Sequence, residues 1–226
     1  MRISRPEEIP WPFSRLYSRI TGRVFTKWFR KIAEDIKDSG IYGTILDIGT
    51  GPGRLPVEIA KKVDNADILG IDLSKDMIKM AKKNADKAGL SERIKFKVAN
   101  AYSTGFEDNS IDLVVCIGVI HHLREPLNLF NEIFRILKSG GRAWIFDGRK
   151  DVTKAEFTDT VRQLGIEKDL PLRLWIITKI WPFMHVGCKT EVYISGNIGQ
   201  ALKESIFEDY EIKKEGVYVR IELVKP

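Results

Sequence analysis

Residues 44–54 read TILDIGTGPGR, a short apolar strand that ends in Asp47 and runs into three glycines at alternate positions. Those glycines, Gly49, Gly51 and Gly53, let the chain turn sharply out of the strand and let a ligand lie against bare backbone. A helix is expected to follow directly, and the N-terminal end of a helix carries a partial positive charge that it points at such a ligand. The pattern therefore predicts a loop that binds a nucleotide-type cofactor.

The spacing of the glycines argues against the two most familiar nucleotide loops. The dinucleotide fingerprint G-x-G-x-x-G requires a third glycine where this chain has Arg54, and no G-K-S or G-K-T follows as in a P-loop. Asp47 would repel a pyrophosphate but attract the ammonium and sulfonium groups of S-adenosylmethionine. A second carboxylate, Asp72, ends the apolar stretch DILGID and is placed to accept the hydroxyls of an adenosine ribose. Together these features favour S-adenosylmethionine, although an aspartate at a strand end is also a common helix cap.

Four stretches, in this order, resemble the class I S-adenosylmethionine-dependent methyltransferases, close to the branch of quinone-ring and related small-molecule enzymes. They are LDIGTGPGRL (46–55), GIDLSKDMIKMAKKNA (70–85), FKVANAYSTGFEDNSIDLVVCIGVIHHL (96–123) and NEIFRILKSGGRAWIFD (131–147). The resemblance covers roughly residues 43–147 and, weakly, 195–224. It implies an enzyme that takes a methyl group from S-adenosylmethionine.

The resemblance also implies which residues hold the cofactor. The methionine moiety would be bound by Asp47, Gly49 and Gly51, the ribose by Asp72, and the adenine would be flanked by Met77 and Leu73. The implied set is completed by Thr50, Gly53, Asn100, Ala101 and Ile117. One departure matters, because the family usually has Gly-Asp-Ala where this chain has Ala-Asn-Ala at 99–101. The amide oxygen of Asn100 can still accept from the adenine amino group, but a neutral acceptor binds more weakly than a carboxylate.

Alternating strand and helix signals predict an α/β fold with a Rossmann-like, seven-stranded, mostly parallel sheet covered by helices on both faces. Strands are expected near residues 44–48, 67–71, 94–98, 111–117 and 141–147, with helices near 54–63, 75–89 and 126–138. A final helix near 197–206 and strands near 208–214 and 217–224 would complete the sheet. The last strand is expected to be antiparallel, as the family implies.

We expect a single methyltransferase domain over residues 1–226, an ordinary length for one hydrophobic core. Ligands of open α/β sheets bind at the carboxyl ends of the strands, so segments outside the core can fold over that edge and recognise substrate. The predicted parts are an N-terminal helical cap (1–40), a cofactor-binding core (41–149), a substrate-cap insert after the fifth strand (150–195), and a C-terminal helix with two strands (196–226).

The N-terminal segment is strongly basic. Residues 1–31 hold eight Lys and Arg against two Glu, a local charge of +6 that equals the formal net charge of the whole chain. Within residues 15–31 a basic stripe recurs every four residues beside an apolar side, and Gly22 is a candidate break between two helices. A solvated face over a packed helix explains this pattern, and so does attraction to an anionic substrate, a lipid surface or RNA.

The second extra segment contains LPLRLWIITKIWPFMHVGC at residues 170–188. These aromatic and aliphatic residues either join the core or line an apolar pocket. With the basic helix they favour a small hydrophobic or anionic substrate over a nucleic acid. The motifs N-P-P-Y and Pro-Cys, typical of enzymes that methylate bases, are both absent from the chain.

Methyl transfer from a sulfonium mainly requires a nucleophile aligned with the methyl carbon, and a base helps when that nucleophile carries a proton. His121 and His122 follow the fourth expected strand and are the catalytic candidates, with His122 also a substrate contact. The alternative is that they only bond to backbone. Tyr17 and His185 are further candidates for substrate contact, and Asp147 is a weaker one for acid–base work. No metal site is expected, because no cluster of carboxylates accompanies the histidines.

The two cysteines, Cys116 and Cys188, lack the spacing of a zinc or redox motif, and the apolar runs fall short of the roughly 18 residues of a membrane span. We therefore expect a cytoplasmic S-adenosylmethionine-dependent methyltransferase that acts on a small molecule and has no transmembrane segment. The alternatives are an RNA or protein methyltransferase, and a non-catalytic protein that binds S-adenosylmethionine. A nicotinamide dehydrogenase is disfavoured by Arg54.

Overall fold

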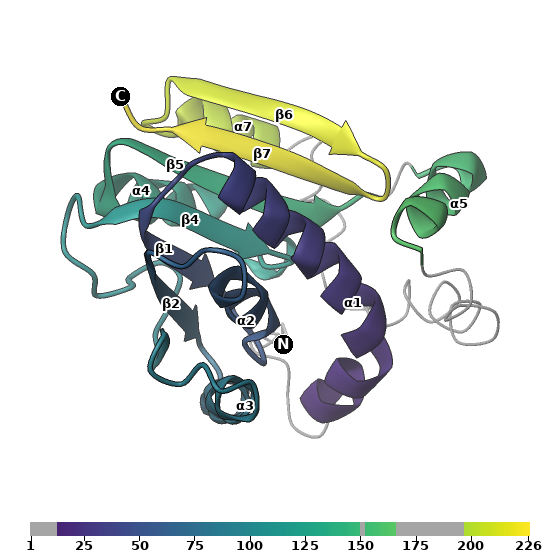
Figure 1. Ribbon diagram of the computed structural model, residues 1–226. Coiled ribbons are helices and arrows are strands. Elements are labelled where there is room, and N and C mark those ends of the chain that lie inside the picture. Colours follow the sequence, from purple (N-terminus) through teal and green to yellow (C-terminus); the bar gives the residue numbers. More distant parts are fainter. Residues whose placement is uncertain (1–12, 150–151, 166–196) are drawn as a thin grey trace, which may run out of the picture.

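The computed structural model describes residues 13–149, 152–165 and 197–226, with side chains from Phe25 in the first range and from Ile198 in the last. Strands and helices alternate along the chain, as the sequence predicts (Figure 1). The elements are α1 (Phe13–Asp38), β1 (Gly43–Ile48), α2 (Arg54–Ala60), β2 (Ala66–Asp72), α3 (Lys75–Lys87), β3 (Ile94–Val98), β4 (Ile111–Ile117), the 3-10 helix η1 (Ile120–His122), α4 (Pro126–Ile136), β5 (Leu137–Gly148), α5 (Lys154–Gln163), α7 (Asn197–Glu204), β6 (Asp209–Glu215) and β7 (Tyr218–Val224).

Seven strands form one sheet in the order β3-β2-β1-β4-β5-β7-β6. Strands β1 to β5 pair in parallel, whereas β7 is antiparallel to both β5 and β6. The predicted mixed sheet with an antiparallel last strand is therefore confirmed. Strand β1 lies between β2 and β4, so the strand order reverses there, and this switch point is where open α/β sheets bind their ligands.

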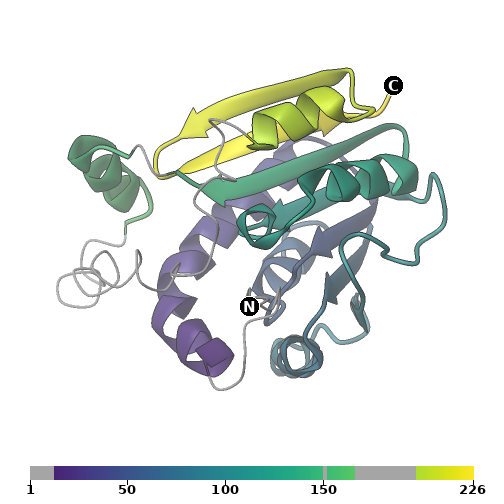
Figure 2. The ribbon, with the colours of Figure 1, turned by 180° about the vertical axis from the view of Figure 1, so that it is seen from behind.

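The sheet is covered on both faces, as its apolar central strands require. Helices α1 and α2 cover one face (Figure 1), and α4 and α7 cover the other (Figure 2). Five of the seven residues of β4 are buried and the other two are half-buried, as expected of a strand between two helical layers. Phe130 and Leu202 belong to the core on the α4 side, while Trp28 and Ile36 belong to the core on the α1 side.

Helix α1 is continuous over its 26 residues, so the expectation of a break at Gly22 is wrong. A single glycine inside a helix costs only about 1 kcal/mol, which the packing of the second half of α1 can offset. Trp28 lies edge-on to Phe146, with ring centroids 5.9 Å apart, and 4.7 Å from the ring of Tyr218. The part of α1 from Phe25 onward is thus a core layer, and a capping role stays a prediction for the residues before it. Those first turns extend past the carboxyl ends of the central strands (Figure 1).

Helix α5 is the described part of the insert after β5. It begins with a capping box in which Thr153 and Glu156 each bond to the other's backbone N–H. Beyond its C-terminal end, the Gly165 carbonyl accepts a hydrogen bond from the Lys27 ammonium of α1. The predicted apolar stretch 170–188 lies outside the described residues. None of the helices in the described ranges is both long and apolar enough to cross a membrane.

Candidate cofactor and active site

The loop after β1 has the backbone shape that its glycines predict. Gly49, Gly51 and Gly53 have φ values of 72°, 51° and 72°. Residues other than glycine rarely adopt this left-handed backbone conformation. The N–H groups of Gly49 and Thr50 both donate to the carbonyl of Ile71, each at 2.8 Å. The loop is therefore fixed to the end of β2 before any ligand binds.

The three glycines have different surroundings. A Cβ added at Gly49 would lie 2.2 Å from Cγ2 of Val119, and one added at Gly53 would lie 2.8 Å from the side chains of Ala81 and Phe96. A Cβ at Gly51 would meet nothing within 4 Å. Gly49 and Gly53 thus allow close packing inside the protein, whereas Gly51 turns bare backbone toward open space.

Asp72 stands beside Gly51. Its Oδ2 accepts the Gly51 N–H at 2.8 Å and its Oδ1 accepts the Ser74 N–H at 2.9 Å. The cap of α3 is Ser74, whose hydroxyl accepts the Met77 N–H at 3.4 Å, so Asp72 is not the helix cap of the alternative interpretation. A carboxylate offers about four lone-pair sites, and these two bonds are compatible with further bonds to two ribose hydroxyls.

Asp47, the last acid of β1, is almost completely buried, with 4% of its surface exposed. Burial raises the pKa of Asp47 to about 7, the neighbouring Thr50 hydroxyl partly opposes this rise, and the nearby Asp72 carboxylate adds to it. A buried carboxyl of this kind is stabilised in its ionised form by a cation. The ammonium and sulfonium of S-adenosylmethionine supply such charge and a pyrophosphate does not, so the residues present fit the predicted cofactor.

The other predicted cofactor-binding residues follow or end β2, β3 and β4, except Met77, which lies on α3. Leu73 is exposed, and Ala101 and Ile117 are half-buried. Met77 is buried on α3, so its contact with the adenine stays a prediction. Asn100 is exposed, and its Oδ1 accepts the N–H of Tyr102 at 2.9 Å.

Tyr102 is a residue of this edge that the sequence analysis missed. Its hydroxyl accepts the N–H groups of Arg124 and Glu125 at 3.1 and 3.2 Å. It therefore ties the turn at Asn100 to the segment that follows the two histidines. Nothing in the sequence pattern marks this contact, because it joins two loops that are distant along the chain.

The histidines stand at the carboxyl ends of β4 and β5. Nδ1 of His121 lies 2.8 and 2.9 Å from the two carboxylate oxygens of Asp147, at the end of β5. The ring of His122 contacts that of His121, with centroids 3.9 Å apart and planes tilted by 43°. The structure thus brings the stronger candidate His121 together with the weaker candidate Asp147, so this histidine does not bond to backbone alone.

Two predicted substrate contacts cannot be placed. The Tyr17 side chain and all of His185 lie outside the described residues, so their roles stay predictions. Within the ranges that the structure describes, no three His, Cys, Asp or Glu side chains gather where they could hold a metal ion.

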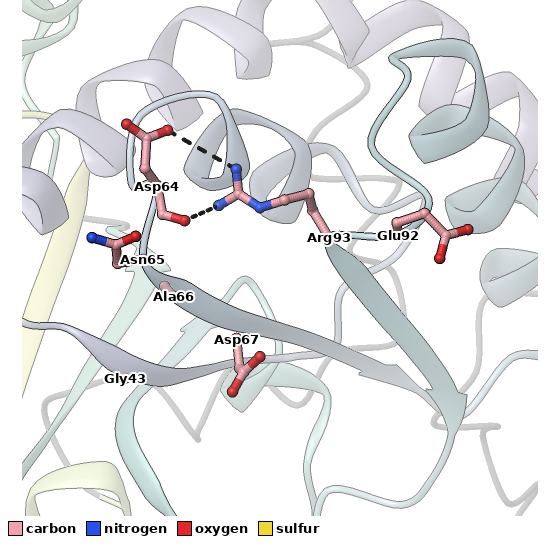
Figure 3. Close-up of a pocket in the computed structure, with 7 residues that line it drawn as sticks. All are labelled: Gly43, Asp64, Asn65, Ala66, Asp67, Glu92 and Arg93. Atoms are coloured by element: carbon pink, nitrogen blue, oxygen red, sulfur yellow. Dashed lines mark hydrogen bonds and ion pairs between the residues drawn. The ribbon is translucent and has the colours of Figure 1, made fainter.

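A hollow at the opposite edge of the sheet is built differently (Figure 3). It is lined at the amino ends of β1, β2 and β3 by Gly43, Asp64, Asn65, Ala66, Asp67, Glu92 and Arg93. The Arg93 guanidinium in this hollow already donates hydrogen bonds to the backbone carbonyls of Val63 and Asp64, at 2.7 and 2.8 Å. We assign the hollow a structural role and place the functional edge at the carboxyl ends of the strands.

A doubly covered α/β sheet with a glycine loop and two acids at its switch point defines the nucleoside-cofactor class of α/β proteins. Comparison with known proteins narrows this class. A family model described as a methyltransferase domain matches residues 46–145. A crystal structure from Methanococcus maripaludis, described as that of a candidate S-adenosyl-L-methionine-dependent methyltransferase, has a TM-score of 0.76 and 27% identity over 100% of this chain and 96% of that one. Over residues 46–145 the chain is therefore similar to the class I S-adenosylmethionine-dependent methyltransferases.

Curated relatives agree over the same region. Phosphoethanolamine N-methyltransferase 1 of Arabidopsis thaliana is 34% identical over 125 residues, which are 54% of this chain and 25% of that protein. A ubiquinone/menaquinone biosynthesis C-methyltransferase of Geotalea uraniireducens is 33% identical over 122 residues, 54% of this chain and 52% of that protein. The chain thus spans between a quarter and about half of the length of these relatives.

Proposed function

We propose that this chain is a cytoplasmic enzyme that transfers the methyl group of S-adenosylmethionine to a small hydrophobic or anionic molecule. The observation that carries the proposal is the bare backbone at Gly51, which faces open space between the buried acid Asp47 and the ribose-binding candidate Asp72. In this proposal Asp47 and the loop glycines hold the methionine moiety. Leu73 and Asn100 lie on the adenine side.

The names of the relatives support a small acceptor. They include phosphoethanolamine, quinone and sterol methyltransferases. A protein substrate is the second candidate, because a release factor glutamine methyltransferase of Chlorobaculum tepidum is 38% identical over 88 residues. A non-catalytic binding protein would share the cofactor site and differ only in the absence of turnover.

Ligand-dependent stability tests the cofactor. A ligand present at 100 times its Kd adds about 2.7 kcal/mol, which raises the melting temperature of a chain of this size by roughly 5–10 °C. We expect that rise with S-adenosylhomocysteine and none with NAD. Stabilisation by NAD alone would refute the proposal.

Turnover tests the acceptor class. The protein is incubated with S-adenosylmethionine labelled in its methyl group and with separate small-molecule, RNA and protein fractions of a cell extract. We expect label in the small-molecule fraction. Label in the protein fraction would favour the second candidate, and cofactor binding without transfer to any fraction would favour the non-catalytic binder.

A further inference from the structure

Asp147 fixes the proton of His121. Besides the two contacts with Nδ1, the carboxylate accepts the backbone N–H of His121 at 3.1 Å and that of Gly148 at 2.7 Å. An ionised carboxylate that already accepts these two backbone N–H groups can only accept from the ring as well, so Nδ1 of His121 carries the hydrogen. In a neutral imidazole the other nitrogen, Nε2, is then the proton acceptor.

The same ring is placed next to the cofactor loop. Val119, two residues before His121, packs on Gly49 so closely that a Cβ there would collide with it. Cε1 of His121 is the nearest atom to the position of a Cβ on Gly118, the residue that follows β4. The imidazole therefore stands over the ends of β4 and β5, beside the loop that is proposed to hold the methionine moiety.

We propose that His121 accepts the proton released by the methyl acceptor and that Asp147 positions it. This inference rests on the proposed function and narrows it: the nucleophilic atom of the substrate must carry a proton, as in a phenol, a primary or secondary amine, or a carbon acid. Thioethers and tertiary amines have no such proton and fall outside this class.

The proton has a defined path in this arrangement. S-adenosylmethionine supplies a methyl group that is already activated for transfer. In a phenol or an amine, a lone pair on oxygen or nitrogen bonds to the methyl carbon, and the excess proton passes to Nε2 of His121. In a carbon acid, the proton passes to Nε2 first and the electron pair of the C–H bond forms the new bond. In either case the electron pair of the broken carbon–sulfur bond stays on sulfur. The resulting imidazolium is stabilised by the Asp147 carboxylate, whose Oδ1 lies 2.8 Å from Nδ1.

Two substitutions of His121 separate catalysis from folding. His121→Asn keeps an N–H where Nδ1 lies and so keeps a donor for Asp147, but it has no group in place of Nε2. His121→Gln keeps a polar group near Nε2 and loses the donor to Asp147. The first variant should fold like wild type and lose activity, and the second should lose both stability and activity.

The experiment measures release of S-adenosylhomocysteine with phenols and primary amines, and separately with thioethers and tertiary amines. We expect turnover with the proton-bearing set only, a drop in kcat of about 10²–10⁴ for His121→Asn, and unchanged calorimetric affinity for S-adenosylmethionine. Asp147→Asn should lower kcat and leave the KM of the acceptor near its wild-type value. Wild-type kcat in His121→Asn, or equal turnover of the thioethers, would overturn the inference.

A spectroscopic measurement judges the histidine without any acceptor. Two-bond ¹H–¹⁵N spectra of histidine-labelled protein, bound to S-adenosylhomocysteine, should show His121 with its hydrogen on Nδ1 in wild type and a mixture in Asp147→Asn. A hydrogen on Nε2 in wild type would overturn the inference even if methyl transfer occurs. Failure of both S-adenosylmethionine and S-adenosylhomocysteine to bind would instead refute the proposed function.

Discussion

At the scale of single residues, Asp47 holds a carboxyl where ionisation costs free energy. Burial is the main reason that its pKa rises to about 7 from an ordinary value of 3.8. Between these two pH values the folded protein keeps a proton that the unfolded chain has lost. Stability therefore falls as pH rises through this window, and the lost contribution stays constant above it.

We predict that Asp47→Asn raises the melting temperature of the ligand-free protein at pH 8 and has a smaller effect at pH 5. Asparagine is neutral at both pH values, as the protonated carboxyl is, so it differs in charge only from the ionised form. Differential scanning calorimetry at the two pH values measures the effect. Equal melting temperatures of wild type and variant at pH 8 would mean that Asp47 ionises without penalty.

The same substitution should weaken cofactor binding. A hydrogen bond to a charged group contributes about 1.5–3 kcal/mol, so we predict a loss of roughly 10- to 100-fold in affinity for S-adenosylmethionine in Asp47→Asn at pH 8. Wild-type affinity should fall between pH 8 and pH 6, as Asp47 takes up its proton, and this part of the pH dependence should be missing from the variant. Isothermal titration calorimetry measures both, and an unchanged affinity in the variant would remove Asp47 from the site.

Gly49 and Gly51 both have a positive φ, but replacing each with alanine should have a different effect. In Gly49→Ala the new Cβ meets Val119 at 2.2 Å, so strain and overpacking should together cost about 2–5 kcal/mol of unfolding free energy. In Gly51→Ala only backbone strain of about 1–2 kcal/mol applies, yet the methyl group should block S-adenosylhomocysteine. Urea unfolding and calorimetry separate the two. Val119→Ala should restore part of the stability of Gly49→Ala, and normal ligand binding by Gly51→Ala would contradict the proposed site.

At the scale of elements, Glu132 ties the loop after β3 to helix α4. Its carboxylate accepts the N–H and the hydroxyl of Thr104 at 2.7 and 2.6 Å, and two guanidinium N–H groups of Arg135 at 2.9 and 2.8 Å. Burial alone would raise the pKa of Glu132, but the bonds from Arg135 and Thr104 outweigh it and hold the pKa below its ordinary value. The stabilisation is therefore present above the unfolded pKa and is lost as pH falls through the folded one.

We predict that Glu132→Gln lowers the free energy of unfolding by about 2–4 kcal/mol at pH 7, because its amide hydrogens would face a donor that the carboxylate now satisfies. The difference from wild type should narrow as pH falls below 4.5, the ordinary pKa of this carboxyl. Urea unfolding curves at several pH values measure it. Glu125→Gln is the control, since Glu125 is exposed at the start of the same helix and its side chain makes no capping bond. A loss as small as that of the control would show that the Thr104 and Arg135 bonds contribute little.

Most elements could be predicted because apolar strands and glycine boundaries are local signals. Strand β5 begins at Leu137, earlier than the expected residue 141, because the stretch through Gly140 reads as a turn. The structure keeps it in the strand by a register shift, in which Ile111 pairs with Leu137 and Leu113 with Arg142. Such an irregularity depends on the neighbouring strand, which the sequence of β5 does not contain.

The residues of the candidate site could be named from the sequence, whereas the contacts between them could not. The loop and its two acids lie within 30 residues and follow strands that can be recognised from sequence. The pairing of His121 with Asp147 follows from β4 and β5 being neighbours, with Ile117 opposite Phe146. Each residue could be named as a candidate, but their contact arises from the sheet order and not from any spacing along the chain.

At the scale of the whole molecule, the two segments that flank the core in sequence meet in space. Lys27 of α1 donates to the Gly165 carbonyl beyond α5, and Leu164 packs against the core cluster to which Trp28 and Ile32 of α1 belong. The two segments therefore contact each other, and their role as a cap over the carboxyl edge of the sheet stays a prediction.

Several basic side chains of α1 are paired with groups of the same chain. Besides Lys27, Arg30 pairs with the buried Glu58 of α2 at 3.1 Å, and Lys31 pairs with Asp35 at 3.4 Å. These three cations have partners within the chain, so the packed-helix interpretation accounts for them. Attraction to an anionic surface is then a hypothesis about the basic residues nearer the start of α1, which are Arg15, Arg19 and Arg23.

We predict that the protein binds vesicles containing anionic phospholipid and that a triple Arg→Ala variant at positions 15, 19 and 23 binds them about 100-fold less well, because each basic residue near such a surface contributes about 1 kcal/mol. Flotation at low and high salt measures the binding, which should weaken as salt screens the charges. The matched control removes the same net charge from helix α3, by replacing the exposed Lys82, Lys83 and Lys87 with alanine. If both variants lose binding equally, the total charge of the protein is the cause. If the arginine variant floats like wild type, the basic residues at the start of α1 do not bind the membrane, and a role in packing over the site explains them better.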